Sequence, residues 1–129
     1  MARNLFALAL VLVAGHAAAE DKSFRVEVEP PAKCAVAAPC EARIKLTALG
    51  GYKVNEEYPF KFVADANAAV AVDGAKFARE GEKTGTLTIK LRAQSAGKQT
   101  VTGTFKLSVC TKDVCKIEAP KVTFAVPVT

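Results

Sequence analysis

The sequence predicts an all-β protein: an immunoglobulin-like antiparallel β-sandwich of about seven to nine short strands, preceded by a signal peptide. Apolar and polar residues alternate with period two in several short runs, and turn-forming residues separate these runs. No segment keeps an apolar face at helical spacing over three turns. A chain of this size with regularly spaced short strands is typical of a sandwich, and a small barrel is the alternative.

The N-terminal residues show the three parts of a secretory signal in order. Arg3 gives a positively charged start, residues 5–14 form an uncharged apolar run, and Ala17-Ala18-Ala19 forms a small-residue cleavage site. The apolar run is shorter than the roughly 20 residues that a transmembrane helix needs. We therefore expect residues 1–19 to be removed and residues 20–129 to form one periplasmic or secreted domain, with no membrane insertion after cleavage.

Alternation is clearest in five runs, at residues 24–28, 42–48, 87–91, 101–109 and 122–126. Tyr58–Val63 is a weaker strand candidate because Pro59 restricts it to an edge or a late start. Ala69–Val72 is another, which Asp73-Gly74 is expected to end in a turn, and the alanine-rich stretch 64–71 is compatible with a helical turn. The residues expected in the core are Phe105, Leu107, Ile89, Leu91, Ile44, Leu46 and Phe124.

Composition excludes several function classes. The formal net charge is +5 for the whole chain and one less once Arg3 is removed, and the lysines are spread along the strands. A nucleic-acid partner is therefore not expected. The single histidine, His16, lies in the signal peptide, which leaves the mature domain without His-dependent triads, Cys–His dyads or imidazole metal ligands. We expect neither a cofactor nor a metal.

Four cysteines remain in the expected domain: Cys34, Cys40, Cys110 and Cys115. An even number in an exported chain predicts disulfides, and spacing favours the two local pairings among the three possible. A four-residue turn would place Cys110 opposite Cys115 on antiparallel strands. A Cys34–Cys40 bridge would staple a loop. Zinc held by four thiolates is the minor alternative, because exported cysteines are usually oxidised.

Several segments together carry a family resemblance. The segment Gly50–Pro59, which reads GGYKVNEEYP, Ser95-Ala96-Gly97, the run Thr100–Val109 and the segment Cys110–Cys115 resemble the N-terminal periplasmic domain of the thiol:disulfide interchange protein DsbD. The likeness covers about residues 24–128, here as a stand-alone module. It departs from the family where Lys53 stands in place of a frequent histidine.

The resemblance implies an immunoglobulin-like fold with Cys110 and Cys115 as a redox pair, shielded by a cap loop to which Phe77 would belong. Cys34 and Cys40, which have no counterpart in the family pattern, would form a structural disulfide. The partners implied are other exported thiol-disulfide proteins or a membrane electron carrier. Lys112 and Lys116 are the cations expected to favour a thiolate, against Asp113.

Two main functional hypotheses follow. The first is an exported thiol-disulfide exchange module that passes electrons through Cys110 and Cys115, an oxidoreductase-type activity without histidine or metal. The alternative is a non-enzymatic immunoglobulin-like binding or structural domain stabilised by two disulfides. A third, weaker hypothesis is an envelope-assembly subunit that pairs with a partner through an edge strand. Reduction potential separates the first two, and we expect Cys110–Cys115 to be the more easily reduced bridge.

Overall fold

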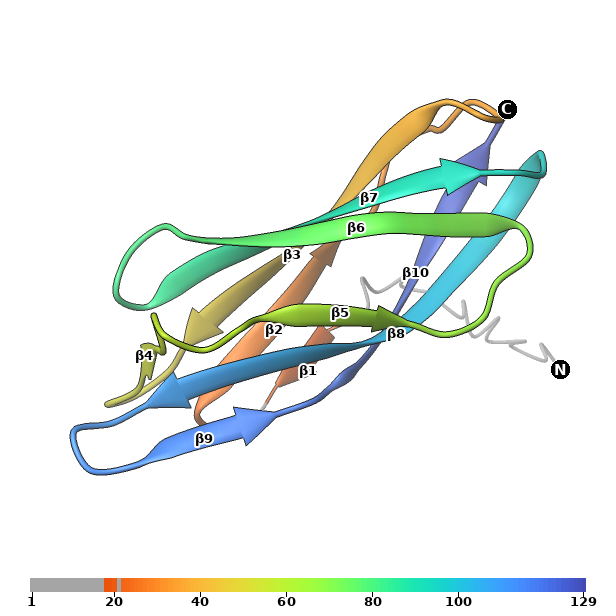
Figure 1. The fold of residues 1–129 in the computed structure, drawn as a ribbon. Coiled ribbons are helices and arrows are strands. Elements are labelled where there is room, and N and C mark those ends of the chain that lie inside the picture. Colours follow the sequence, from red (N-terminus) through yellow and green to blue (C-terminus); the bar gives the residue numbers. More distant parts are fainter. Residues whose placement is uncertain (1–17, 21) are drawn as a thin grey trace, which may run out of the picture.

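The computed structural model describes residues 18–20 and 22–129, and these form two facing β-sheets without a helix (Figure 1). Every pairing between named strands is antiparallel. The first sheet has the order β1 (Ala18–Glu20), β2 (Phe24–Glu29), β3 (Pro39–Ala48), β7 (Thr84–Ala93), β6 (Val70–Arg79). The second contains β4 (Lys53–Val54), β5 (Lys61–Ala64), β8 (Gly97–Cys110), β9 (Cys115–Glu118) and β10 (Lys121–Val128). In this second sheet, the long strand β8 pairs with β4 and β5 along one side and with β9 and β10 along the other.

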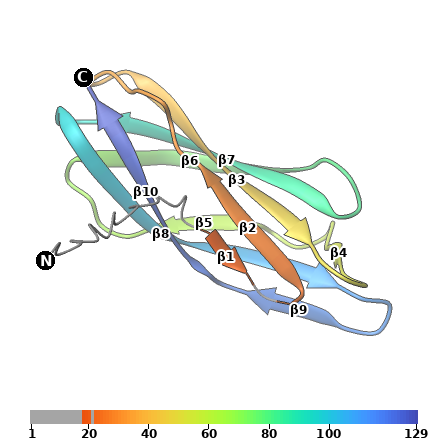
Figure 2. The same ribbon diagram turned by 180° about the vertical axis from the view of Figure 1, so that it is seen from behind.

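The topology confirms the predicted immunoglobulin-like sandwich. Strands β2, β3, β7 and β6 form the four-stranded sheet of that fold, and β5, β8 and the β9–β10 segment form the three-stranded sheet. The described residues hold ten strands rather than seven to nine. The excess arises because the two-residue β4 precedes β5, because β9 and β10 divide one edge of β8 between them, and because β1 adds a short margin to the first sheet (Figure 2).

Alternation along the strands explains the core. Residues of one face of each main strand are buried, while their neighbours in sequence are exposed or half-buried. Phe105 is fully buried in the centre of β8, and its ring lies 6.2 Å from that of Phe60 and 6.4 Å from that of Phe77. All seven predicted core residues are confirmed, since Phe105, Leu107, Ile89, Leu91, Ile44 and Leu46 are 0% exposed and Phe124 is 5% exposed.

Two predictions about strand β6 and the segment before it are wrong. Asp73-Gly74 does not end a strand in a turn; the register with β7 shifts between Val72 and Gly74, so the pair forms a bulge inside β6. The stretch 64–71 contains no helical turn. The Asn67 side-chain oxygen accepts hydrogen bonds from the amides of Ala69 (2.9 Å) and Val70 (3.1 Å), which turns the chain directly into β6.

Two glycines allow aromatic rings to lie directly on the strands. A Cβ at Gly85 would lie 2.2 Å from the Phe77 ring, whereas one at Gly103 would meet the Phe62 ring at 2.4 Å and the carbonyl oxygen of Val63 at 2.8 Å. Both contacts are closer than real Cβ atoms allow. The ring above Gly85 belongs to a side chain that can move, whereas the carbonyl beside Gly103 belongs to the paired strand β5.

The connection between β2 and β3 crosses to the second sheet. Cys34 forms a parallel bridge with Val128; its amide donates to the carbonyl of Pro127, and its carbonyl accepts from Thr129, both at 2.8 Å. Cys34 is bonded to Cys40 of β3 and is 2% exposed. The disulfide therefore joins a segment held by β10 of one sheet to a strand of the other. The bridge therefore does more than close the loop between Cys34 and Cys40 that the sequence predicts, because it also connects the two sheets.

Candidate functional site

The second disulfide closes the hairpin between β8 and β9. Cys110 and Cys115 stand directly opposite each other in the register, with 4.0 Å between their Cα atoms. The turn is also closed without the sulfurs, because the amide of Thr111 donates to the carbonyl of Val114 at 2.8 Å. The Thr111 hydroxyl accepts from the amides of Asp113 (3.3 Å) and Val114 (3.2 Å). Both local pairings favoured by the spacing are thus present.

The sulfurs lie on the outer face of the second sheet. Val109 of β8 is buried in the core, and neighbouring residues of a strand point to opposite faces, so Cys110 and Cys115 face outward. Cys115 is exposed and Cys110 is half-buried. Beside them, Val114 is 51% exposed and Ile117 is 68% exposed. An exposed cysteine with exposed apolar neighbours favours contact between a disulfide and another protein's thiolate.

The segment that carries the family resemblance lies against this hairpin. Lys53 stands opposite Cys110 in the register of β4 and β8, on the side of β8 away from β9. Two positions further along, Asn55 is joined to Ser108 through a backbone hydrogen bond of 3.1 Å and a side-chain hydrogen bond of 3.3 Å. Ser108 is fully buried although it points outward, because this segment covers it. The sequence does not predict that Lys53 lies beside Cys110, because 57 positions separate the two residues and pairing between distant strands leaves no local pattern.

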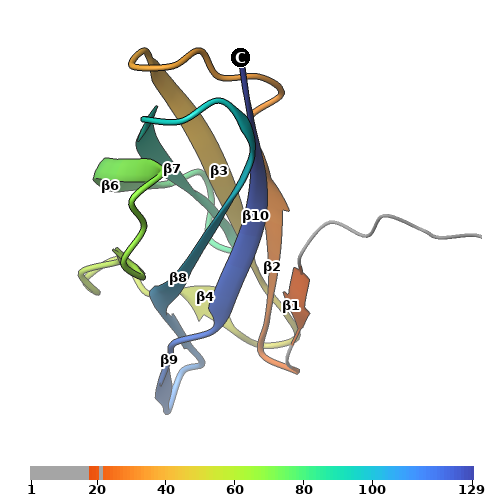
Figure 3. The ribbon, with the colours of Figure 1, turned by 90° about the vertical axis from the view of Figure 1, so that its right-hand side faces the viewer.

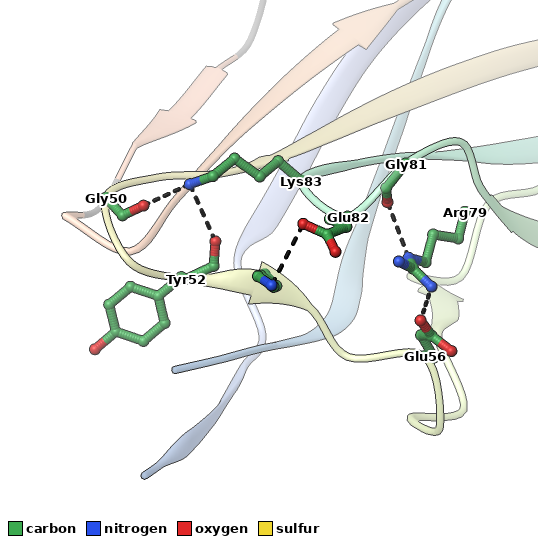
Figure 4. Close-up of polar contacts among 8 residues, drawn as sticks. Gly50, Tyr52, Glu56, Arg79, Gly81, Glu82 and Lys83 are labelled. Atoms are coloured by element: carbon green, nitrogen blue, oxygen red, sulfur yellow. Dashed lines mark hydrogen bonds and ion pairs between the residues drawn. The ribbon is translucent and has the colours of Figure 1, made fainter. Parts of the chain in front are cut away.

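Polar contacts fix the same end of the sandwich (Figure 4). Lys83, in the turn between β6 and β7, donates to the carbonyls of Gly50 and Tyr52. In the same turn, Glu82 forms an ion pair with Lys53 at 3.3 Å. Arg79 of β6 forms an ion pair with Glu56 and donates to the carbonyl of Gly81, the latter at 2.9 Å (Figure 4). The turn of the first sheet therefore holds β4 in position next to Cys110.

Neither Lys112 nor Lys116, the two lysines expected to favour a thiolate, is the cation that stands opposite a bridged cysteine. Lys116 stands opposite the core residue Val109, so its side chain leaves the strand on the face away from the sulfurs, and its ammonium lies 5.3 Å from the centre of the Tyr52 ring. Lys112 is exposed in the turn. Lys53 is the cation directly opposite Cys110 in the register, on the same face, and Glu82 pairs with it.

Phe77 lies in strand β6 and not in a cap loop. Its ring stacks on Phe60 with 3.8 Å between centroids, and it reaches Phe105, five residues before Cys110 on the extended β8. Five residues of a strand span about 17 Å, so these contacts place the ring in the middle of the sandwich. Together with Tyr58 it lines an open cleft of about 450 Å³ between β6 and the segment that leads into β5. The assignment of Phe77 as a cap over the bridge is therefore corrected.

No protein-family model matches the sequence, and no curated protein matches it. One solved structure of similar architecture is that of AggA, the major subunit of aggregative adherence fimbriae type I from Escherichia coli. It has 12% sequence identity and a TM-score of 0.48, and the match covers 89% of this chain and 100% of that one. A likeness of this degree carries nothing about function, and it does not bear on the resemblance to the DsbD domain.

Two further features of the described part of the chain concern ligands and membranes. Residues 18–20 and 22–129 contain no group of three or more histidine, cysteine, aspartate or glutamate side chains arranged to hold a metal ion. They also contain no helix long and apolar enough to span a bilayer. The candidate signal peptide, His16 included, lies outside the described residues apart from Ala18 and Ala19.

Proposed function

We propose that the chain is an exported, non-enzymatic immunoglobulin-like domain that serves as a binding or structural module and is stabilised by two disulfides. The observation that carries this proposal is the Cys34–Cys40 bridge, in which Cys34 is buried, because it joins the two sheets at a point that backbone hydrogen bonds already fix to β10. Bridges of this kind are structural in most exported proteins. Export itself is supported by the disulfides and by the signal-like N-terminus.

A second candidate is thiol-disulfide exchange at Cys110–Cys115. The specific observation in its favour is accessibility, since Cys115 is exposed and lies next to the exposed side chains of Val114 and Ile117. Thiol-disulfide exchange requires an attacking thiolate to reach one sulfur of the bridge. Cys34, in contrast, is 2% exposed. The two bridges therefore differ in the property that the exchange function needs.

A redox titration decides between the candidates. The oxidised protein is equilibrated in graded glutathione and dithiothreitol buffers, and each cysteine pair is followed by alkylation and mass spectrometry. We expect Cys110–Cys115 to be reduced first, with both potentials below about −300 mV, as is typical of structural bridges. A Cys110–Cys115 potential near that of exchanging proteins, at about −120 to −270 mV, would replace the structural proposal by the exchange candidate.

A kinetic control separates accessibility from function. Reduction of Cys110–Cys115 is timed with dithiothreitol and with reduced thioredoxin, in the wild type and in Ile117→Ser. If the bridge is only structural, the substitution changes both rates equally. If Ile117 contacts a redox partner, the substitution slows reduction by thioredoxin and leaves the rate of reduction by dithiothreitol unchanged.

A further inference from the structure

Strand β2 has an edge whose only cover in the described residues is β1. The pairs are Ala18 with Glu27, Ala19 with Val26 and Glu20 with Arg25, and Figures 2 and 3 show β1 at the margin of the first sheet. Two of these three β1 residues lie before the proposed cleavage site. Cleavage after Ala19 would therefore remove the partners of Val26 and Glu27 and leave Glu20, opposite Arg25, as the one β1 residue on this edge.

Three other edge strands, β6, β10 and β5, have features that discourage pairing with a strand of another chain. Strand β6 has the bulge at Asp73 and the exposed Lys76. Strand β10 has Pro127 next to its last residue and is covered there by the segment around Cys34. Strand β5 is four residues long and follows Pro59. Strand β2 is six residues long, with neither a bulge in its register with β3 nor a proline within it. Of these four strands, β2 is the best suited to accept another strand.

The hydrogen-bonding direction of β2 follows from its register with β3. The amide of Leu49 donates to the carbonyl of Ser23, so odd-numbered residues of β2 direct their backbone groups toward β3. The amides and carbonyls of Phe24, Val26 and Val28 consequently point to the open edge. A partner strand must pair with these three residues.

The charges of β2 are complementary to a second copy of the same strand. Arg25 and Glu27 both lie on the solvent face and form an ion pair with each other at 2.7 Å. If two β2 strands meet antiparallel about a two-fold axis at Val26, Arg25 of each copy stands opposite Glu27 of the other, twice. Such directly opposite residues have Cα atoms about 4.5 Å apart, and opposite charges there are stabilising.

The neighbouring registers are disfavoured by the same charges. An axis at Arg25 would place the two Arg25 side chains against each other, and an axis at Glu27 would do the same with the two Glu27 carboxylates. Like charges directly opposite destabilise a strand pair. The axis at Val26 also pairs Phe24 of one copy with Val28 of the other, so the outward backbone groups of all three residues find partners.

We propose that signal cleavage uncovers the β2 edge at Val26 and Glu27 and that the mature domain pairs there with a second copy of itself, antiparallel about Val26. Glu27 of the other copy then takes the place of Glu20 opposite Arg25. The two first sheets then form one continuous sheet, and the interface is isologous, as expected for a two-fold dimer. Because the contact consists of one six-residue strand, the dimer is weak. The inference rests on the proposed cleavage and not on the redox role of either bridge, so the titration above can fail without affecting it.

Sedimentation velocity of the mature protein from about 10 µM to 1 mM, after its intact mass has shown a start at Glu20, tests the proposal. We expect a concentration-dependent dimer that Glu27→Arg weakens at least tenfold, because arginine then faces arginine twice. The double variant Arg25→Glu/Glu27→Arg restores complementarity and should restore the dimer. Circular dichroism melting of each variant verifies that it is folded.

The matched control is Glu41→Arg. Glu41 lies on the same solvent face as part of a similar pair with Arg43, but on the interior strand β3, so this substitution should leave the dimer unchanged. Four outcomes would overturn the proposal: a monomer up to 1 mM, a dimer that survives Glu27→Arg, a double variant that stays monomeric while folded, or an exported chain that retains Ala18 and Ala19.

Discussion

Removing each disulfide separately measures how differently the two bridges serve the fold. The perturbations are the double variants Cys34→Ala/Cys40→Ala and Cys110→Ala/Cys115→Ala. The bridged residues are 6 and 5 positions apart. Loop-closure entropy therefore assigns nearly the same contribution to both, about 2 kcal/mol each. Any difference between the variants must come from the folded state.

The Cys34–Cys40 bridge should stabilise the folded state more than the Cys110–Cys115 bridge does. Cys34 is 2% exposed and belongs to the core cluster, so its truncation removes buried apolar area and loosens the segment on β10. We expect about 1–2 kcal/mol beyond loop closure, or about 3–4 kcal/mol in all. Cys115 is exposed, and the hairpin keeps its backbone pairing and its Thr111 turn, so about 2 kcal/mol or less is expected there.

Urea denaturation of the oxidised proteins, with the m-value checked for each variant, gives both free energies of unfolding. An unchanged m-value is required, because otherwise the variant has altered the compactness of a state and not only its stability. Equal losses, or a larger loss from Cys110→Ala/Cys115→Ala, would refute the interpretation of Cys34–Cys40 as the brace between the sheets.

Three further substitutions test the packing. Phe105→Ala should lower the free energy of unfolding by about 3–5 kcal/mol, because the ring is fully buried; a loss below about 1 kcal/mol in urea melts would contradict that burial. Gly103→Ala should destabilise more than Gly85→Ala in the same assay, since its Cβ would meet a backbone carbonyl as well as a ring. Ala37→Gly should raise the thermal midpoint by a few degrees, because Ala37 has a φ of 62°, and a lower midpoint would show that the turn prefers alanine.

The strands that sequence analysis predicted well are those with one face in the core. Leu87, Ile89 and Leu91 are fully buried while their polar neighbours are not, so burial leaves a period of two in the sequence. Strand β6 has no such period, because it lies at a sheet edge and a bulge interrupts it. Alternation of apolar and polar residues therefore indicates a strand that buries one face. The alternation is weak in a strand that buries few side chains.

Pairing between distant segments leaves no local pattern at all. No residue near Cys34 indicates that its backbone forms hydrogen bonds with β10, more than 90 residues later in the chain. The short spacing between Cys34 and Cys40 predicts only a bridged loop. The position of Lys53 next to Cys110 was hidden for the same reason. The cysteine pairing could be predicted because it is local, whereas the role of each bridge depended on contacts that only the fold supplies.

The two bridges pose different questions about why the cysteines are present. Cys34–Cys40 has a structural explanation, since it fixes the two sheets to each other at a buried point. Cys110–Cys115 closes a hairpin in which four residue pairs of β8 and β9 and a hydrogen-bonded turn already hold the chain. Its remaining contribution is the entropy of a short loop, which any bridge of that length would supply. If the Cys110–Cys115 bridge proves dispensable for folding, the exposure of Cys115 still needs an explanation. The reduction potential of the bridge is then the measurement that assigns its role.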